Sequence, residues 1–252
     1  EGNRVGWGDL LPHVIEIPND DIEPAARLFA EHGDKIAAVI SEPVQGAGGV
    51  IPPPDGYLDG LRRLCTDNGA LLIFDEVISG FGRTGEWFAA QTYKVTPDLI
   101  TFAKGVTSGY LPLSGVIISR ELADELENDD YGKLMHGYTY SGHPTAAAAA
   151  LANISVIESG GLLQEAHRIG EQMEAGLKAL AGDGMIKSYR GIGGIWACEL
   201  GWSGLEASRA MVDKGVVCRG IGEALAFCPP LIITDSEIGT IFDRLDEVLR
   251  EH

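Results

Sequence analysis

The sequence predicts an α/β fold in its first half and a smaller α+β domain after it. Short runs of branched apolar residues recur along the first half, and stretches with apolar residues at helical spacing separate them. Continuous apolar strands that alternate with helices are typical of a parallel sheet covered on both faces. We expect a helix at 55–68 and strands at 36–41, 70–74, 99–103 and 115–119.

The second half begins with a long helical pattern that runs from Pro144 to the glycine pair Gly160-Gly161. We place the domain boundary inside this helix, so that residues 1–150 belong to the larger domain and residues 151–252 form the smaller one. A closing amphipathic helix is expected from Ser236, capped by Asp235-Ser236. Between them we expect helices at 162–181 and 205–214 and strands at 189–199, 216–218 and 224–227.

Composition excludes several classes of protein. The 252 residues include 37 Asp and Glu against 19 Lys and Arg, a formal charge of −18. So acidic a surface repels phosphate backbones and anionic lipid, which argues against nucleic acid and membranes as partners. The four cysteines form no C-x-x-C pair, and no His cluster has zinc spacing, so we expect no metal site. Without a visible signal peptide or an apolar run of about 20 residues, we expect a cytoplasmic protein.

Two charged residues follow directly on predicted strands. Asp75 comes after the strand at 70–74, and Lys104 comes after the strand at 99–103. Open α/β sheets place their ligand sites at the carboxyl ends of parallel strands, so both side chains are expected at one edge of the sheet. A structural ion pair between them explains the spacing nearly as well.

The same two residues suit one kind of chemistry if the lysine acts as a nucleophile. A lysine in an apolar site has a lowered pKa and attacks carbonyl groups. A nearby carboxylate can hold a pyridinium nitrogen protonated. Lys104 and Asp75 together therefore supply what pyridoxal phosphate requires, an anchor for its aldehyde and a counter-ion for its ring.

A second motif resembles a dinucleotide fingerprint. Gly80-Phe-Gly-Arg-Thr-Gly85 satisfies G-x-G-x-x-G and follows a predicted strand. A true fingerprint needs a helix that opens on the loop, inside a strand–helix–strand unit. Only residues 86–97 lie before the next strand, and their aromatic residues are poor material for such a helix. We therefore do not expect this loop to bind a dinucleotide.

Six segments of the chain form a recognisable series of motifs. They are Glu42-Pro-Val-Gln-Gly-Ala-Gly-Gly-Val50, Leu71-Leu-Ile-Phe-Asp-Glu-Val77, Gly80-Phe-Gly-Arg-Thr-Gly85, Pro97-Asp-Leu-Ile100, Ala103-Lys-Gly105 and His136-Gly-Tyr-Thr-Tyr-Ser-Gly-His-Pro144. In order and spacing they resemble the class III pyridoxal-phosphate-dependent aminotransferases of fold type I. The resemblance implies a large domain with a mostly parallel sheet, incomplete here, and a smaller C-terminal α+β domain.

The resemblance implies roles for individual residues. Lys104 is similar to the lysine that forms a Schiff base with pyridoxal phosphate and then moves the substrate's proton, and Asp75 to the carboxylate that pairs with the pyridinium nitrogen. Val77 would lie against the ring, although it is equally well explained as core. Gln45 would lie near the phenolic oxygen, and Glu42 belongs to the same cofactor segment unless it only partners a helix or loop.

The resemblance also implies a homodimer with shared active sites. Thr139 is similar to the threonine that donates to the cofactor phosphate from the neighbouring subunit; as an alternative, it only caps a loop. The family's amino-terminal half, with its phosphate-binding turn, has no counterpart in the sequence. We therefore expect the chain to be part of a longer enzyme.

The segment around Arg219 favours one branch of the family. It resembles the ω-amino acid and amine–pyruvate transaminases, in which an arginine at this place binds a substrate carboxylate. The arginine of ornithine and 4-aminobutyrate enzymes is replaced here by Ala226. The alternative is that Arg219 is an ordinary surface residue. Arg190, before Gly191, is expected to be structural.

The sequence therefore predicts a transaminase that moves an amino group from an amine or ω-amino acid to a keto acid such as pyruvate. The alternatives within the class are a 4-aminobutyrate or diamine aminotransferase and an aminomutase. A non-catalytic truncated homologue is the alternative outside it.

Overall fold

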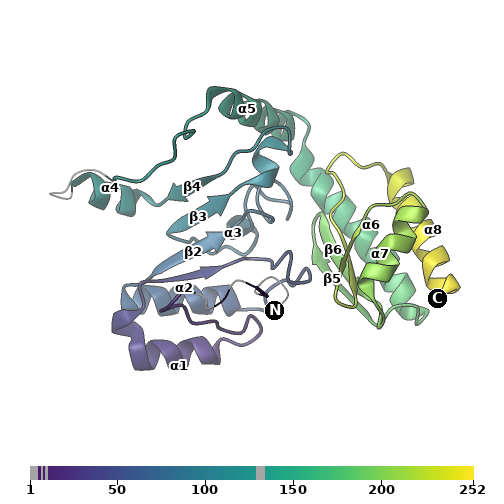
Figure 1. Cartoon of the computed structure of the whole chain (residues 1–252), viewed down its shortest axis with the longest axis horizontal. Helices are drawn as coiled ribbons and strands as arrows, with labels where there is room; N and C mark the ends of the chain where they lie inside the picture. The colour runs from purple at the N-terminus through teal and green to yellow at the C-terminus, as the bar shows by residue number, and fades with distance from the viewer. Residues whose placement is uncertain (1–4, 7, 9–10, 129–133) are drawn as a thin grey trace.

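Two domains lie side by side and are joined by consecutive helices (Figure 1). The computed structural model describes residues 5, 6, 8, 11–128 and 134–252. The larger domain is built on one four-stranded sheet and the smaller domain on another. The predicted α/β fold class with a second, α+β domain is confirmed.

The sheet of the larger domain has the strand order β1-β2-β3-β4. β1 (Ala38–Ser41), β2 (Leu71–Asp75) and β3 (Leu99–Phe102) are parallel, whereas β4 (Gly115–Ile118) is antiparallel to β3. The predicted mostly parallel sheet is therefore confirmed, with β4 as its one antiparallel strand among the described residues. Only the short 3₁₀ helix η3 (Lys104–Thr107) and a turn connect β3 to β4, and a parallel return needs a longer crossover.

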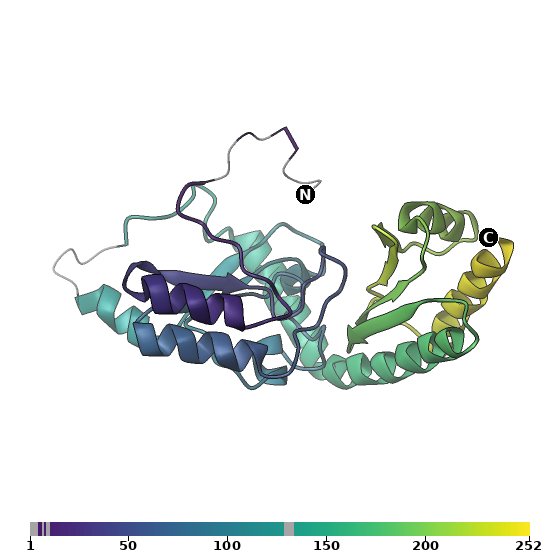
Figure 2. The ribbon, with the colours of Figure 1, turned by 90° about the horizontal axis from the view of Figure 1, so that it is seen from below.

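Helices cover one face of this sheet. α1 (Glu23–His32) and α2 (Tyr57–Asn68) lie side by side along it (Figure 2), and the short η2 (Gly33–Lys35) follows α1. Leu61 and Cys65 of α2 pack with Leu72 and Phe74 of β2, all of them fully buried. Alternation along the strands places these strand residues on one face and Asp75 on the other.

The opposite face is open among the described residues. It carries Ile40, which is 64% exposed, and Val116, which is 56% exposed. These residues share that face with Asp75, because Val116, Thr101 and Asp75 are aligned across the strands. The expectation that both faces are covered is therefore wrong for this part of the chain, since no described helix packs there.

The helices α5 (Pro144–Ser159) and α6 (Leu162–Gly182) link the domains. The predicted boundary at residue 150 falls within α5, whose Ala150 and Ile157 pack with Phe81 and Val106 of the larger domain. Leu162 and Leu163, at the start of α6, still pack against this cluster. No single helix in the described ranges is long and apolar enough to cross a membrane; α5 and α6, bent by 65°, pass that test only as a pair.

The smaller domain packs three helices against an antiparallel sheet of order β5-β6-β8-β7. Its strands are β5 (Ser188–Ile192), β6 (Ile195–Glu199), β7 (Arg219–Ile221) and β8 (Ala224–Phe227), and its helices besides α6 are α7 (Gly204–Asp213) and α8 (Asp235–Glu251). The core joins Met173 and Leu177 of α6 with Met211 of α7 and Leu245 of α8. The larger domain also contains the helices α3 (Ala89–Thr92) and α4 (Arg120–Asn128).

Three expectations are corrected in this domain. The strand expected at 189–199 is the hairpin β5–β6, because Gly193 adopts a φ of 52° and lets the chain reverse. The strand expected at 216–218 begins later, at Arg219, where pairing with β8 starts. The cap of α8 is Thr234 rather than Asp235-Ser236, because Thr234 and Glu237 form a reciprocal capping box.

Candidate functional site

Asp75 ends β2 on the open face of the sheet. Its Oδ1 accepts hydrogen bonds from the Val77 amide at 3.1 Å and from the Thr101 hydroxyl at 3.2 Å. No hydrogen bond within the described ranges reaches its Oδ2. One carboxylate oxygen thus fixes the side chain, and the other is available to a cationic nitrogen.

Lys104 begins η3, directly after β3. Its φ of 43° places a residue other than glycine in the left-handed region, a strained conformation that is frequent at functional sites. Among the described residues its amine has no hydrogen bond or ion pair, so the alternative of a structural ion pair with Asp75 is not observed. The side chain is also exposed. The described residues therefore do not bury it in an apolar site.

Glu42, just beyond β1, lies within reach of the charges of both Asp75 and Lys104. Burial raises the pKa of its carboxyl, the Gly46 amide lowers that pKa, the Asp75 charge raises it and the Lys104 charge lowers it. Its Oε2 accepts a hydrogen bond from the Gly46 amide at 2.9 Å. Glu42 therefore partners the loop after β1, as the alternative reading has it, and lies close enough to both candidate catalytic residues to sense their charges.

The other predicted cofactor residues are placed differently. Gln45 is part-buried, and its side-chain oxygen accepts a hydrogen bond from Asn19 at 2.9 Å. Val77 is also part-buried, next to Asp75. Thr139 is exposed in a turn at 138–141, and no described contact joins it to the rest of the candidate site. The chain thus brings Asp75, Glu42 and Lys104 together without Thr139.

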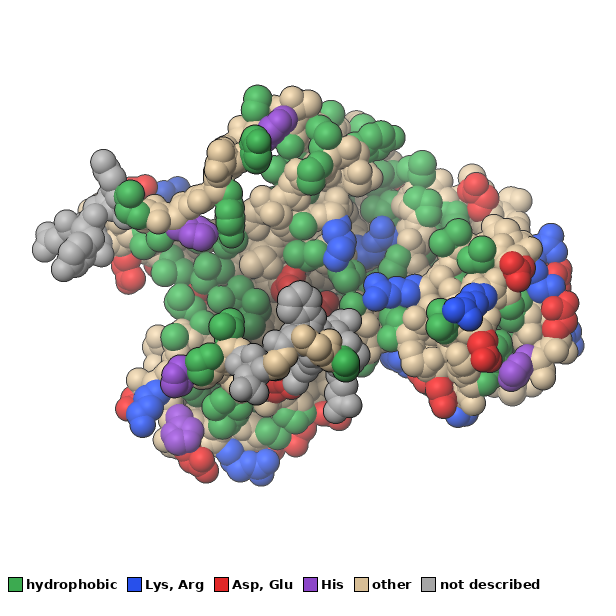
Figure 3. All heavy atoms as spheres, viewed as in Figure 1, with side chains coloured by type: hydrophobic (Ala, Val, Ile, Leu, Met, Phe, Trp, Pro, Cys, Tyr) green, Lys and Arg blue, Asp and Glu red, His purple; other side chains and the backbone are tan. Residues whose placement is uncertain are grey.

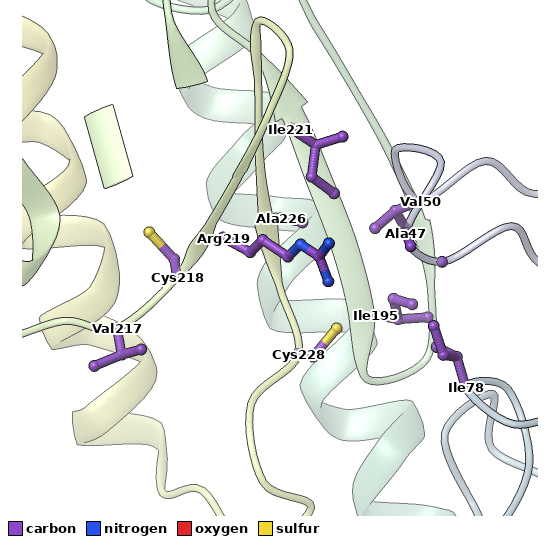
Figure 4. A pocket seen from close by; sticks show the side chains of 11 residues that line it. Ala47, Val50, Ile78, Ile195, Val217, Cys218, Arg219, Ile221, Ala226 and Cys228 are labelled. Carbon is purple, nitrogen blue, oxygen red and sulfur yellow. The ribbon is translucent and has the colours of Figure 1, made fainter. Parts of the chain in front are cut away.

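A cavity of about 280 Å³ lies between the two domains. Arg219 is the one charged side chain in its described lining, and it makes no hydrogen bond or ion pair within the described ranges. Figure 4 shows its guanidinium beside Cys228 and directed toward the loop that carries Ala47 and Val50. The lining consists of Gly46, Ala47, Val50, Ile78, Ile195, Val217, Cys218, Arg219, Ile221, Ala226 and Cys228.

Cys228, in the lining of this cavity, senses the charge of Lys104. Burial raises the pKa of its thiol, and the charges of Arg83, Arg219 and Lys104 lower it. Basic side chains gather in the hollow between the domains (Figure 3). No motif in the sequence singles out Cys228, although it directly follows the predicted strand at 224–227, in the same way that Asp75 and Lys104 follow theirs.

The Gly80–Gly85 motif contacts the other domain. The helix after it, α3, is only four residues long, and it begins after Phe88, so no helix opens on the loop as a dinucleotide fingerprint requires. Instead Arg83 donates hydrogen bonds to the carbonyls of Gly194 at 2.9 Å and Pro229 at 2.6 Å. Gly82 and Gly85 of this motif have positive φ angles, which let the backbone turn tightly at the domain interface.

The chain has the fold of the fold type I transaminases: an α/β sheet with an aspartate and a lysine at its strand ends, joined to a domain with an antiparallel sheet. The chain superimposes on the crystal structure of a PMP-bound aminotransferase from Vibrio fluvialis with a TM-score of 0.93 at 32% identity, over 100% of this chain and 63% of that one. Residues 2–249 match the family Aminotransferase class-III. The chain belongs to this family.

Curated relatives of this chain differ in their named substrates. The chain is 40% identical to the omega-aminotransferase of Caulobacter vibrioides, over 98% of this chain and 62% of the relative. It is 39% identical to the diaminobutyrate–2-oxoglutarate transaminase of Halomonas elongata, over 89% of this chain and 52% of the relative. The chain thus spans between about half and just under two thirds of the length of these proteins.

Proposed function

We propose that the protein is a pyridoxal-phosphate-dependent aminotransferase that transfers an amino group from an amine or ω-amino acid to a keto acid such as pyruvate. One observation carries this proposal. Lys104 and Asp75, whose Oδ2 has no hydrogen bond among the described residues, lie at the carboxyl ends of adjacent parallel strands, and Arg219 is the one charged side chain in the described lining of the cavity. Membership of the class III family supports the reaction type.

The described residues fit pyridoxal phosphate. When bound, this cofactor supplies an electron-accepting ring and carries the amino group between substrates. The Lys104 amine would hold the aldehyde end and later move the substrate's proton. The Asp75 Oδ2 would bind the ring nitrogen and keep it protonated, while Val77 and Gln45 would contact the ring and its phenolic oxygen. Glu42 would hold the loop that carries Gln45 through the Gly46 amide.

The cavity favours a keto acid and an apolar amine as the substrate pair. Arg219 can bind a carboxylate with two parallel hydrogen bonds, because its guanidinium is not engaged by the described residues. The lining around it is mostly apolar and, as far as it is described, contains no carboxylate. A diamine would leave its second ammonium group unpaired there, which argues against the alternative of a diamine aminotransferase.

We further propose that the protein forms a homodimer with shared active sites. We also propose that it is cytoplasmic. Thr139 lies among strongly exposed apolar residues, including Met135 at 91%, Tyr138 at 78% and Tyr140 at 82%. Exposed apolar side chains at this density are typical of a surface that another chain covers. Thr139 would then reach the cofactor phosphate of the partner subunit rather than that of its own.

Borohydride reduction followed by peptide mapping tests the role of Lys104. We expect the cofactor mass on Lys104 and the loss of the cofactor's visible absorbance in Lys104→Ala. Label on another residue would contradict the assignment, and a purified protein without the yellow colour of the cofactor would favour the non-catalytic alternative.

Product analysis separates the transaminase from its relatives within the class. Incubation with a carboxylate-free amine and pyruvate should yield alanine and a ketone or aldehyde. An aminomutase would instead rearrange an amino acid without producing alanine. Arg219→Leu should raise the KM for pyruvate, since the carboxylate loses its cation; an unchanged KM would leave Arg219 an ordinary surface arginine.

A further inference from the structure

Arg190 joins the two domains through a loop of the larger one. Its Nε donates hydrogen bonds to the carbonyls of Gly49 at 2.9 Å and Val50 at 3.0 Å. Its Nη1 forms an ion pair with Glu199 at 3.0 Å, across the β5–β6 hairpin. The guanidinium is thus anchored to its own sheet and holds the backbone of the other domain.

The loop that Arg190 holds is strained. Gly49 has a φ of 130°, and Val50 has a φ of 53°. A branched residue in the left-handed region is a rare outlier, which persists only where the surroundings fix it. Val50 is 1% exposed and packs against Ile195, Ala197 and Ala226 of the smaller domain. Contacts from the smaller domain therefore maintain this loop, which also forms one wall of the cavity.

Arg190 and Arg219 lie in one row across the sheet of the smaller domain. Arg190 pairs with Ala197, Ala197 with Ala226, and Ala226 with Arg219. Residues directly opposite each other in an antiparallel sheet point to the same face. Strands spaced about 4.8 Å apart put the two arginines about 14 Å from each other along this row. The alanines between them leave room on that face for the loop of the larger domain and for a ligand.

We propose that Arg190 is a positioning residue for keto-acid binding: by holding the carbonyls of Gly49 and Val50 it sets the distance between the 46–51 loop and Arg219. One end of the row is locked to the larger domain, and the other end presents Arg219 to the cavity (Figure 4). The inference rests on the proposed transaminase function, because only a carboxylate substrate uses Arg219.

Rate constants of the two half-reactions, measured on the purified holoenzyme, distinguish a positioning role of Arg190 from a general effect on stability. A carboxylate-free amine does not use Arg219, whereas pyruvate does. In Arg190→Gln we expect the second-order rate constant for pyruvate to fall at least about ten-fold more than that for the amine, because small misplacement of a binding group has large kinetic effects. Arg190→Lys, which retains a donor for the carbonyls, should recover part of the loss.

Arg168→Gln is the matched control. Arg168 is also a part-buried arginine of the smaller domain, but its described partners, Glu165, Asp235 and the Ile233 carbonyl, all belong to that domain. We expect its substitution to lower stability while affecting both half-reactions equally. In an Arg219→Leu background, Arg190→Gln should add no further selective loss for pyruvate.

Amide hydrogen exchange provides a readout independent of activity. Arg190→Gln should speed exchange at the Gly49, Val50 and Ile51 amides and leave α2 unchanged. Equal losses in both half-reactions, or unchanged exchange in this loop, would overturn the inference. If the wild-type enzyme forms no alanine from any amine, the proposed function fails, and exchange in the loop alone decides whether Arg190 positions it.

Discussion

At the scale of single residues, the candidate site depends on polar atoms that the fold holds in place but leaves unbonded. Asp75 is oriented through Oδ1 by Val77 and Thr101, while Oδ2 has no hydrogen bond among the described residues. Arg219 likewise reaches the cavity without a described partner. A side chain such as Asp75 is well suited to binding when one of its atoms is held by the protein and another is free for the ligand. The side chain is then already oriented before the ligand arrives.

Asp75→Asn tests the charge of this residue separately from its position. The amide oxygen of asparagine can still accept from Val77 and Thr101, so we expect the thermal midpoint to stay nearly unchanged. Loss of the negative charge should lower kcat by about 10²–10³, the usual effect of removing one preorganised electrostatic contact. Steady-state kinetics with an amine and pyruvate measure this; activity near the wild-type value would contradict the pairing with the ring nitrogen.

Glu42 predicts a pH dependence of stability. Burial raises the pKa of its carboxyl above the ordinary 4.5. Since the native state then holds the proton more tightly than the unfolded chain, this contribution to stability is fully present below pH 4.5 and is lost as pH rises through the folded pKa. A glutamine at this position can still accept the hydrogen bond from the Gly46 amide, and it carries no charge.

Urea unfolding of the wild-type apoprotein and Glu42→Gln over a series of pH values checks this expectation. The free energy of unfolding of the variant should increase relative to that of the wild type as pH rises from 4.5 toward neutrality. A difference that stays constant across this range would show that the buried charge of Glu42 does not affect stability.

At the scale of elements, a buried carboxylate holds the segment between β2 and α3. Glu76 is fully buried and accepts three hydrogen bonds, from the Ser79 hydroxyl at 2.8 Å and from the Ala89 and Ala90 amides at 2.7 Å each. A helix of four residues such as α3 does not persist by itself. Glu76 therefore fixes the start of α3 and the turn that contains Arg83.

Glu76→Gln should destabilise the protein although it conserves the shape of the side chain. One end of the glutamine is an NH₂ group, which cannot accept from a backbone amide, so a buried donor is left unsatisfied. We expect a loss of roughly 2–3 kcal/mol in the free energy of unfolding. Ser79→Ala, which removes one hydroxyl donor, should cost about 1 kcal/mol. Chemical denaturation measures both, and a Glu76→Gln variant as stable as Ser79→Ala would contradict this role.

At the scale of the whole molecule, the two domains hold each other through reciprocal arginines. Arg83 of the larger domain binds the Gly194 and Pro229 carbonyls, and Arg190 of the smaller domain binds the Gly49 and Val50 carbonyls. The Gly194 amide also donates to the Arg83 carbonyl at 2.8 Å. The cavity lies between these contacts, so its width depends on how the domains meet.

Gly193→Ala tests how closely the domains approach. Gly193 has a φ of 52°, and a Cβ on it would lie 2.6 Å from the Arg83 carbonyl oxygen. We expect a loss of about 3 kcal/mol or more, because backbone strain and a steric clash add. Gly184 provides the control: its φ is 71° and a Cβ there meets nothing within 4 Å.

Gly184→Ala should cost roughly 1–2 kcal/mol, the usual penalty of the left-handed conformation alone. Thermal and urea unfolding compare the two variants. Equal losses would show that the contact between Gly193 and the Arg83–Thr84 backbone contributes nothing to stability.

Much of the fold could be predicted from local patterns, and the errors have a common cause. The strands of the larger domain and the helices α2, α5 and α6 follow from apolar periodicity, which depends on neighbours in sequence. The direction of β4 and the hairpin within 189–199 depend on which strand pairs with which. Exposure of Lys104 likewise depends on what packs over it, and strand-end position alone does not reveal that.

The sequence by itself determined the class of the protein, because the residues that define the family occur in order along the chain and at strand ends that periodicity locates. It also determined Asp75, Lys104 and Arg219 as candidates. Only the tertiary structure decided that Arg190 and Arg219 share one row of a sheet and that Arg83 reaches Pro229, 146 residues away. Such contacts form when distant segments fold against each other, so no local pattern of residues encodes them.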